Sequence, residues 1–171
     1  MPKPVAETRE ARYNYERIFV KPGPPQGMTE EQFQQVSDRL RKRLKQEAGR
    51  TGDLGDDIFV HGSRGRGTAE VDADLDIGIR VSAERFDQLI RDRLARVREG
   101  SDKWETLQEA IRQGRLHAGE AGISGIRQEI QRLLNVEMNL GFAKGVQITV
   151  IREAGPFDQG PFLPLRQQGG N

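Results

Sequence analysis

The sequence of 171 residues contains no cysteine. Disulfide bonds and thiolate metal sites are therefore excluded, and hard, oxygen-ligated cations become the favoured metals. No apolar run approaches the roughly 20 residues that a membrane-spanning helix needs. The first residues do not combine a charged segment with an apolar core, so we expect no secretory signal peptide.

Neither sign of charge dominates the chain. It has 27 Lys and Arg residues against 26 Asp and Glu residues, which leaves a net charge of +1 and no overall basic field for nucleic acid. A local basic cluster at residues 39–45 either follows a nucleic-acid backbone or forms the solvated face of a helix. Aromatic residues are only 6% of the chain, and none interrupts this cluster, which argues against base stacking there.

The length of the chain and the distribution of its prolines predict one domain with short tails. Prolines interrupt the first segment repeatedly, at positions 2, 4, 22, 24 and 25, and they oppose regular structure there. We therefore expect a tail or linker at residues 1–28, a domain at 29–166, and a short tail at 167–171. A length of 171 residues suits one domain with its own core.

The order of predicted elements favours an α+β fold. Thr29 and Gln32 have the spacing of a capping box, and apolar residues follow them at helical period. Buried strands are expected at residues 58–60, 74–81 and 146–151, and further helices near 82–97, 101–111 and 123–134. This order predicts a small mixed β-sheet with helices packed on it.

The predicted strand at residues 74–81 carries the residues with the clearest chemistry. Its aliphatic side chains alternate with Asp74 and Asp76, so the two carboxylates project from the same face, roughly 6.7 Å apart along the backbone. Two such carboxylates repel each other unless a cation or an arginine lies between them. Carboxylate oxygens suit Mg²⁺ or Mn²⁺, and such ions also bind the phosphates of a nucleotide.

The segment before this strand suits phosphate binding. Gly62 allows the backbone to approach a phosphate closely, and Ser63 offers a hydroxyl group. Arg64 and Arg66 lie in a glycine-rich turn at residues 64–68, where their charges can neutralise phosphate. His61 precedes the turn, either as a structural residue or as a substrate contact.

Residues 61–68, followed by Asp74-Leu75-Asp76, resemble the Gly-Ser … D-x-D signature of the polymerase-beta-like nucleotidyltransferase superfamily. More narrowly, residues 57–165 resemble the nucleotidyltransferase-like toxin domains of bacterial polymorphic toxins such as Rhs-type effectors. Further matches lie at residues 79–87, 118–122 and 155–161. The resemblance implies that Gly62 and Ser63 hold the phosphates of an NTP and that Asp74 and Asp76 bind Mg²⁺.

The resemblance also implies a third acid on a later strand, which helps to activate the acceptor hydroxyl. Gln147 occupies the place where that acid is expected, and glutamine cannot accept a proton. Either Glu137 supplies the third acid, or the protein works with two carboxylates, or the chain is a non-catalytic member of the superfamily.

The sequence therefore predicts a metal-dependent enzyme that transfers a nucleotidyl group from an NTP to RNA, including tRNA, to another nucleic acid, or to a protein hydroxyl. As a toxin domain without its own signal peptide it acts in the cytoplasm of a target cell, and an immunity protein neutralises it; otherwise the protein is cytoplasmic. The alternative is a catalytically depleted module that binds nucleotide, RNA or a partner protein. A small-molecule transferase is less favoured, because no acceptor pocket is evident.

Overall fold

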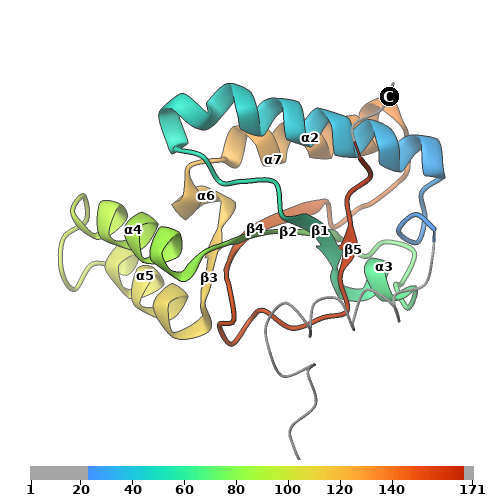
Figure 1. Cartoon of the computed structure of the whole chain (residues 1–171). Helices are drawn as coiled ribbons and strands as arrows, with labels where there is room; N and C mark the ends of the chain where they lie inside the picture. The colour runs from blue at the N-terminus through green and yellow to red at the C-terminus, as the bar shows by residue number, and fades with distance from the viewer. Residues whose placement is uncertain (1–22, 168–171) are drawn as a thin grey trace, which may run out of the picture.

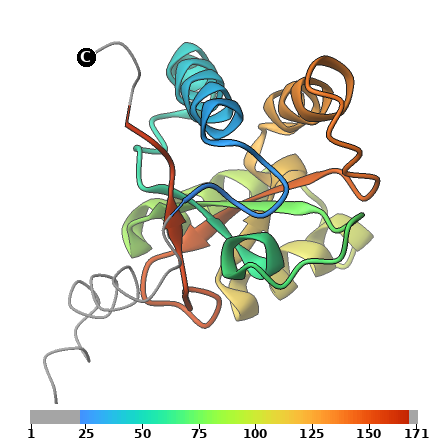
Figure 2. The same cartoon turned by 90° about the vertical axis from the view of Figure 1, so that its right-hand side faces the viewer.

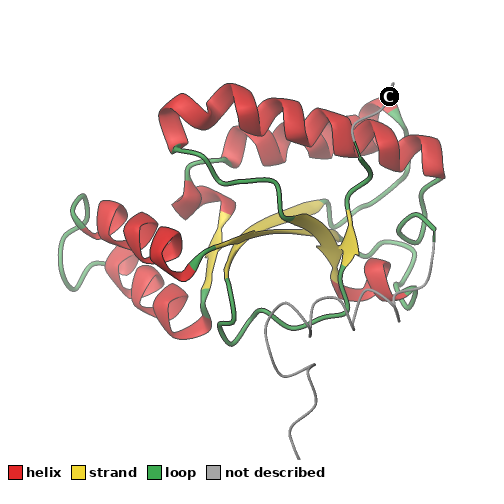
Figure 3. Ribbon diagram, viewed as in Figure 1, coloured by secondary structure: helices red, strands yellow, loops and turns green. Residues whose placement is uncertain are grey.

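The computed structural model describes residues 23–167 (Figure 1). Its centre is a five-stranded mixed sheet with the order β3-β4-β2-β1-β5, and helices surround the sheet (Figure 3). This arrangement confirms the predicted α+β class. Most of the predicted tail at residues 1–28 lies outside the described residues. In the described part of this segment, Pro25 and Met28 are buried.

The sheet is built around two neighbouring pairs of strands. β1 (Ile58–His61) pairs antiparallel with β2 (Leu75–Val81), and β2 pairs parallel with β4 (Val146–Arg152). The short strands β3 (Arg115–His117) and β5 (Leu163–Pro164) complete the two edges, each antiparallel to its neighbour. The first residues of β2 and β4 consequently lie side by side with the last residue of β1.

One face of the sheet is covered by α2 (Glu30–Thr51) and α7 (Ser124–Arg132), which lie side by side in Figure 2. The predicted capping box is present at the start of α2, where the Thr29 side chain accepts a hydrogen bond from Gln32 N and the Gln32 side chain accepts one from Thr29 N. The apolar side chains of α2 that were predicted to share one face are all buried in the main core: Phe33, Val36, Leu40 and Leu44.

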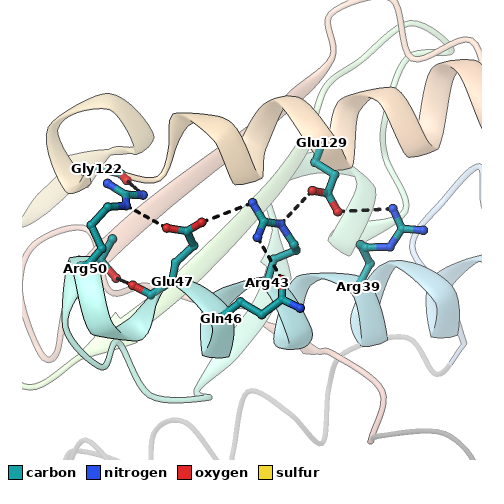
Figure 4. A network of polar contacts seen from close by, with 8 residues as sticks. Arg39, Arg43, Gln46, Glu47, Arg50, Gly122 and Glu129 are labelled. Carbon is teal, nitrogen blue, oxygen red and sulfur yellow. Dashed lines mark hydrogen bonds and ion pairs between the residues drawn. The ribbon is translucent and has the colours of Figure 1, made fainter.

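Part of the basic cluster at residues 39–45 joins these two helices. Arg43 donates to Glu129 of α7 over 2.8 Å, and Arg39 forms a longer ion pair of 3.4 Å with the same carboxylate (Figure 4). Arg43 also pairs with Glu47 on its own helix. These arginines therefore hold α2 against α7, and the cluster is not a uniform free basic face.

The remaining helices lie beside the sheet and at its ends. α4 (Ala83–Leu94) and α5 (Asp102–Gln113) pack against each other and contact β4 and β3. α6 (Ala118–Ala121) follows β3, and the π-helical turn η2 (Leu133–Glu137) continues α7. α3 (Gly62–Arg66) is a single short helix directly after β1. No helix within residues 23–167 is long and apolar enough to cross a membrane.

The second face of the sheet carries a small separate core. Phe59, Ile151 and Phe162 pack together there, with Phe157 against them. The chain crosses this face between β4 and β5, on the side opposite α2 and α7 (Figure 1). Gly78 makes room for this packing, since a Cβ atom at that position would lie 2.7 Å from both Phe59 and Ile151 atoms. The outward face of β2 is therefore partly covered by protein.

Candidate active site

The two aspartates of the D-x-D motif lie together at the beginning of β2. Asp74 directly precedes the strand, which starts at Leu75, and Asp76 is its second residue. The two carboxyl groups share a hydrogen bond, and the pKa of Asp76 is raised to about 6 by burial, by the charge of Asp74 and by that hydrogen bond, in this order. Two neighbouring acids whose charges oppose each other in a half-buried position are suited to bind a cation.

Gly62 lies against this pair because of the register between β1 and β2. His61 is opposite Asp76 in the antiparallel ladder, and the chain leaves β1 at Gly62 with a φ of +70°. A Cβ atom at Gly62 would lie only 2.3 Å from Asp76 Oδ2. Glycine is therefore required here both by the backbone conformation and by the neighbouring carboxylate.

The glycine-rich segment after β1 forms a short helix where the sequence predicted a turn. α3 spans Gly62–Arg66 and ends at Gly67, which has a left-handed conformation. No side chain of a described residue caps its first turn. Ser63 is half-buried there, and its carbonyl accepts a hydrogen bond from Thr68 N. The first residue of α3, Gly62, therefore lies beside the Asp76 carboxylate.

Arg64 is built into the protein and does not line the site. Its side chain is buried, and its guanidinium donates to the carbonyl oxygens of Gln26, Val71 and Ala73 over 2.8 to 3.0 Å. The guanidinium also lies 3.6 Å from the ring centroid of Phe142. With its donors taken by these carbonyls, Arg64 fixes the loop that leads into Asp74, in place of the phosphate contact predicted for it.

A pocket of about 550 Å³ opens above the aspartate pair. His61, Gly62 and Arg66 line one side, and Asp74 and Asp76 lie at its base. The opposite sides come from two other parts of the chain: Arg115, His117, Gln147 and Thr149 on β3 and β4, and Pro156, Phe157, Gln159, Gly160 and Pro161 on the segment after β4. Residues far apart in the sequence thus meet around the carboxylates.

The segment at residues 156–161, which we call the wall, is anchored from below by Arg80. This arginine of β2 donates to Asp158 Oδ1 over 2.7 and 2.9 Å and to Asp57 over 3.1 Å. Its guanidinium packs against the rings of both Phe59 and Phe162, at 4.7 and 4.5 Å from their centroids. Asp158 in turn accepts a hydrogen bond from Ala154 N. The ion pair therefore holds the wall against the sheet.

A family model described as "Nucleotidyltransferase domain" matches residues 37–151 of the chain. The chain belongs to this nucleotidyltransferase family. The match confirms the nucleotidyltransferase part of the predicted resemblance and, with it, nucleotidyl transfer from an NTP as the reaction class. It ends at Ile151, before the wall begins. Comparisons with curated proteins and with solved structures find no match.

Two acids, Asp74 and Asp76, line the nucleotidyltransferase site, and Glu137 lies outside it. Glu137 lies in η2, where its side chain is exposed, and it does not line the pocket. Gln147 does line the pocket, because the parallel register of β2 and β4 places it opposite Asp76. Within residues 23–167 no group of three or more His, Cys, Asp or Glu side chains is arranged to hold a metal.

This donor set still fits Mg²⁺. The ion commonly uses one or two protein carboxylates, and substrate phosphates and water supply its other ligands. The hydrogen-bonded pair of Asp74 and Asp76 offers two such carboxylates, and the amide of Gln147 faces the same pocket. The residues present therefore suit an ion that is completed by the bound nucleotide.

His61 lines the pocket as a neutral side chain. Its Nε2 atom is buried and has no hydrogen-bond partner among the described residues. Burial, together with the charges of Arg115 and Arg66, lowers the pKa of His61 to about 4. Its ring packs edge-on against Phe59 and Phe157. The imidazole is thus uncharged at neutral pH, with one nitrogen facing no protein partner.

Arg115, His117, Thr149 and the wall are pocket residues that the site prediction did not include. Arg115 is the first residue of β3, a strand of only three residues that begins shortly after α5, so no local motif marks it. Phe157 belongs to a segment that the sequence resemblance included, but nothing in its Gly- and Pro-rich surroundings indicates that it faces the aspartates.

Proposed function

We propose that the protein is a Mg²⁺-dependent nucleotidyltransferase that transfers a nucleotidyl group from an NTP to an acceptor hydroxyl. The observation that carries this proposal is the Asp74–Asp76 pair, which shares a pocket with the first turn of α3 and with Arg66. When bound, Mg²⁺ would neutralise phosphate charge and orient the transferred group. The carboxylates hold the ion, and the start of α3 and Arg66 bind phosphate oxygens.

The proposal includes the acceptor class and the biological role. The acceptor is a hydroxyl of RNA, including tRNA, of another nucleic acid, or of a protein, and the chain acts as a toxin domain in the cytoplasm of a target cell, where an immunity protein neutralises it. This role is supported by the resemblance of residues 79–87, 118–122 and 155–161 to polymorphic toxin domains. The last of these segments contains the wall of the pocket.

The test uses purified protein with Mg²⁺ and NTPs labelled on the α-phosphate, together with total RNA or cell lysate. Label transferred to RNA or protein by the wild type, and its loss in Asp74→Asn and Asp76→Asn, is the expected result. Asp72→Asn is a matched control, because Asp72 is an exposed acid two residues from Asp74 that does not line the pocket. Equal transfer by the wild type and the two pocket variants would refute the proposal.

A second candidate is a nucleotidyltransferase-fold module that binds nucleotide, RNA or a partner protein without turnover. The glutamine at position 147, opposite Asp76 in the ladder, specifically favours it. The two functions differ in what Gln147→Glu does. In an active enzyme transfer is already measurable before the change, whereas a depleted module binds NTP tightly, transfers no label as wild type, and gains transfer only when the third acid is restored.

A further inference from the structure

Many arginines of the described chain have their charge matched by a nearby acid. Ion pairs are formed by Arg39, Arg43, Arg50, Arg80, Arg112, Arg152 and Arg166. Other described arginines form no ion pair and donate to backbone carbonyls, as Arg64, Arg85 and Arg93 do. The two arginines that line the pocket also form no ion pair, and their place beside the aspartates distinguishes them. Within residues 23–167, neither Arg66 nor Arg115 forms an ion pair with a carboxylate, although the pocket contains Asp74 and Asp76. The pocket therefore contains two guanidinium groups that are not held in a contact ion pair, although both attract the Asp76 carboxylate from a longer distance.

Arg115 is the more informative of the two, because it is partly buried whereas Arg66 is exposed. Its Nε atom donates to Gln113 Oε1 over 2.7 Å, and its guanidinium lies 4.4 Å from the ring centroid of Phe157. Both partners are neutral. They hold the guanidinium in place through a hydrogen bond and a ring contact, and the acids Glu109 and Asp76 act on its charge without a contact ion pair.

Arg66 and Arg115 approach the same pocket from different elements. Both line the pocket whose lining also includes His61 and Asp76. Arg66 belongs to α3 after β1, and Arg115 belongs to β3 at the far edge of the sheet. An anion in the pocket would therefore meet a guanidinium on each side and the aspartate pair at the base.

We propose that Arg115 binds the triphosphate of the NTP opposite Arg66, and that the ring of Phe157 positions its guanidinium for this contact. The inference rests on the proposed function, since it assigns a residue to the same nucleotide site. A planar guanidinium can donate two parallel hydrogen bonds to phosphate oxygens. Phe157 acts through Arg115, so it is a positioning residue.

The first experiment measures the Kd of inorganic tripolyphosphate in the presence of Mg²⁺ by isothermal titration calorimetry, with the full chain. Arg115→Ala is expected to weaken binding by about ten- to a hundredfold, as for loss of a charge-assisted contact. Arg115→Lys keeps the charge and is expected to recover part of the loss. Arg112→Ala is the matched control, because Arg112 pairs with Glu109 on α5 and does not line the pocket. Circular dichroism checks that each variant is folded.

The second experiment tests the positioning role of Phe157 with a double-mutant cycle. Phe157→Leu keeps an apolar side chain but removes the aromatic face, and it is expected to weaken tripolyphosphate binding several-fold. In the Arg115→Ala background the same change is expected to have no further effect. An equal effect in both backgrounds would show that Phe157 supports the wall without acting through Arg115, and would overturn that part of the inference.

The outcomes separate this inference from the function on which it rests. If the wild type transfers label but Arg115→Ala binds tripolyphosphate as tightly as Arg112→Ala, the inference is wrong and the enzyme assignment stands. If Arg115→Ala weakens binding of RNA alone, Arg115 contacts the acceptor and the inference is again wrong. If the wild type binds neither tripolyphosphate nor any NTP, the proposed function itself fails, and the inference fails with it.

Discussion

Asp76 is an acid whose surroundings in the folded protein oppose its charge. Burial and the neighbouring Asp74 raise its pKa to about 6, above the value of about 3.9 expected in an unfolded chain. The folded state therefore binds the proton more tightly than the unfolded state does. The stability that this proton provides is present below about pH 4 and is lost as the pH rises through about 6.

Replacement of this acid by its neutral isostere is expected to stabilise the metal-free protein and to remove activity. Asp76→Asn should raise the free energy of unfolding at pH 7.5, because it removes a half-buried charge beside Asp74. At pH 5, where most of the wild-type side chain is protonated, the gain should shrink. Urea denaturation at both pH values without metal measures this. A variant that is less stable than the wild type at pH 7.5 would contradict the inference that the charge of Asp76 destabilises the metal-free protein.

Gly62→Ala is expected to destabilise the protein and to disturb the active site, more than the same change at a glycine with open surroundings. The added Cβ atom would lie 2.3 Å from Asp76 Oδ2, and the φ of +70° is unfavourable for alanine. We expect a loss of about 1–3 kcal/mol in the free energy of unfolding and loss of label transfer. Gly55→Ala is the control, because Gly55 has a φ of +75° but nothing within 4 Å of the added atom. Equal effects of the two changes would show that the contact with Asp76 is unimportant.

At the scale of elements, the wall depends on one buried ion pair. Asp158→Asn would remove a carboxylate that accepts two hydrogen bonds from Arg80, a side chain only 2% exposed. We expect a loss of about 3 kcal/mol in the free energy of unfolding and a higher KM for NTP with a smaller change in kcat. Denaturation and steady-state kinetics measure the two effects.

Asp57→Asn provides the comparison for this prediction. Asp57 pairs with the same guanidinium but is 38% exposed and lies outside the wall, so its loss should cost less and leave KM unchanged. If Asp158→Asn destabilises the protein but does not alter KM, the ion pair supports the sheet without shaping the pocket.

Helices and strands with a clear periodicity of apolar residues could be predicted from the sequence. The alternation in β2 correctly predicted that Leu75, Ile77 and Ile79 are buried, because strand periodicity is local information. The opposite face of the same strand could not be assigned in this way. Arg80 lies on that face and is buried, since the wall that covers it arrives from residues 156–161, far along the chain.

The site residues also differ in this respect: those that lie in one segment of the sequence could be predicted, and most of those that come from distant segments could not. Gly62, Arg66, Asp74 and Asp76 lie in one segment of sequence, and the structure brings them to one pocket. Arg64 differs because its partners are carbonyls of loops that the sequence pattern does not place beside it. Arg115 and the wall were not predicted to line the pocket, because their position depends on the strand order β3-β4-β2-β1, which composition and spacing do not determine.

At the scale of the whole molecule, nucleotide and metal together are expected to stabilise the fold. A ligand at 100 times its Kd adds about 2.7 kcal/mol to the free energy of unfolding, which corresponds to a rise in Tm of about 5–10 °C for a chain of this size. Thermal unfolding with Mg²⁺, with tripolyphosphate and with both should show the largest shift for the combination. In Asp74→Asn/Asp76→Asn the contribution of Mg²⁺ should disappear, whereas a persistent contribution would place the ion elsewhere.

The pocket holds two acids at its base and two arginines at its sides, so it offers one place for a cation and another for an anion. A cation on the acids makes the pocket more attractive to phosphate, and phosphate near the arginines makes it more attractive to the cation. Thermodynamic linkage requires these two effects to be equal in size. The charge pattern thus makes the site cooperative between metal and nucleotide, with neither one required to bind first.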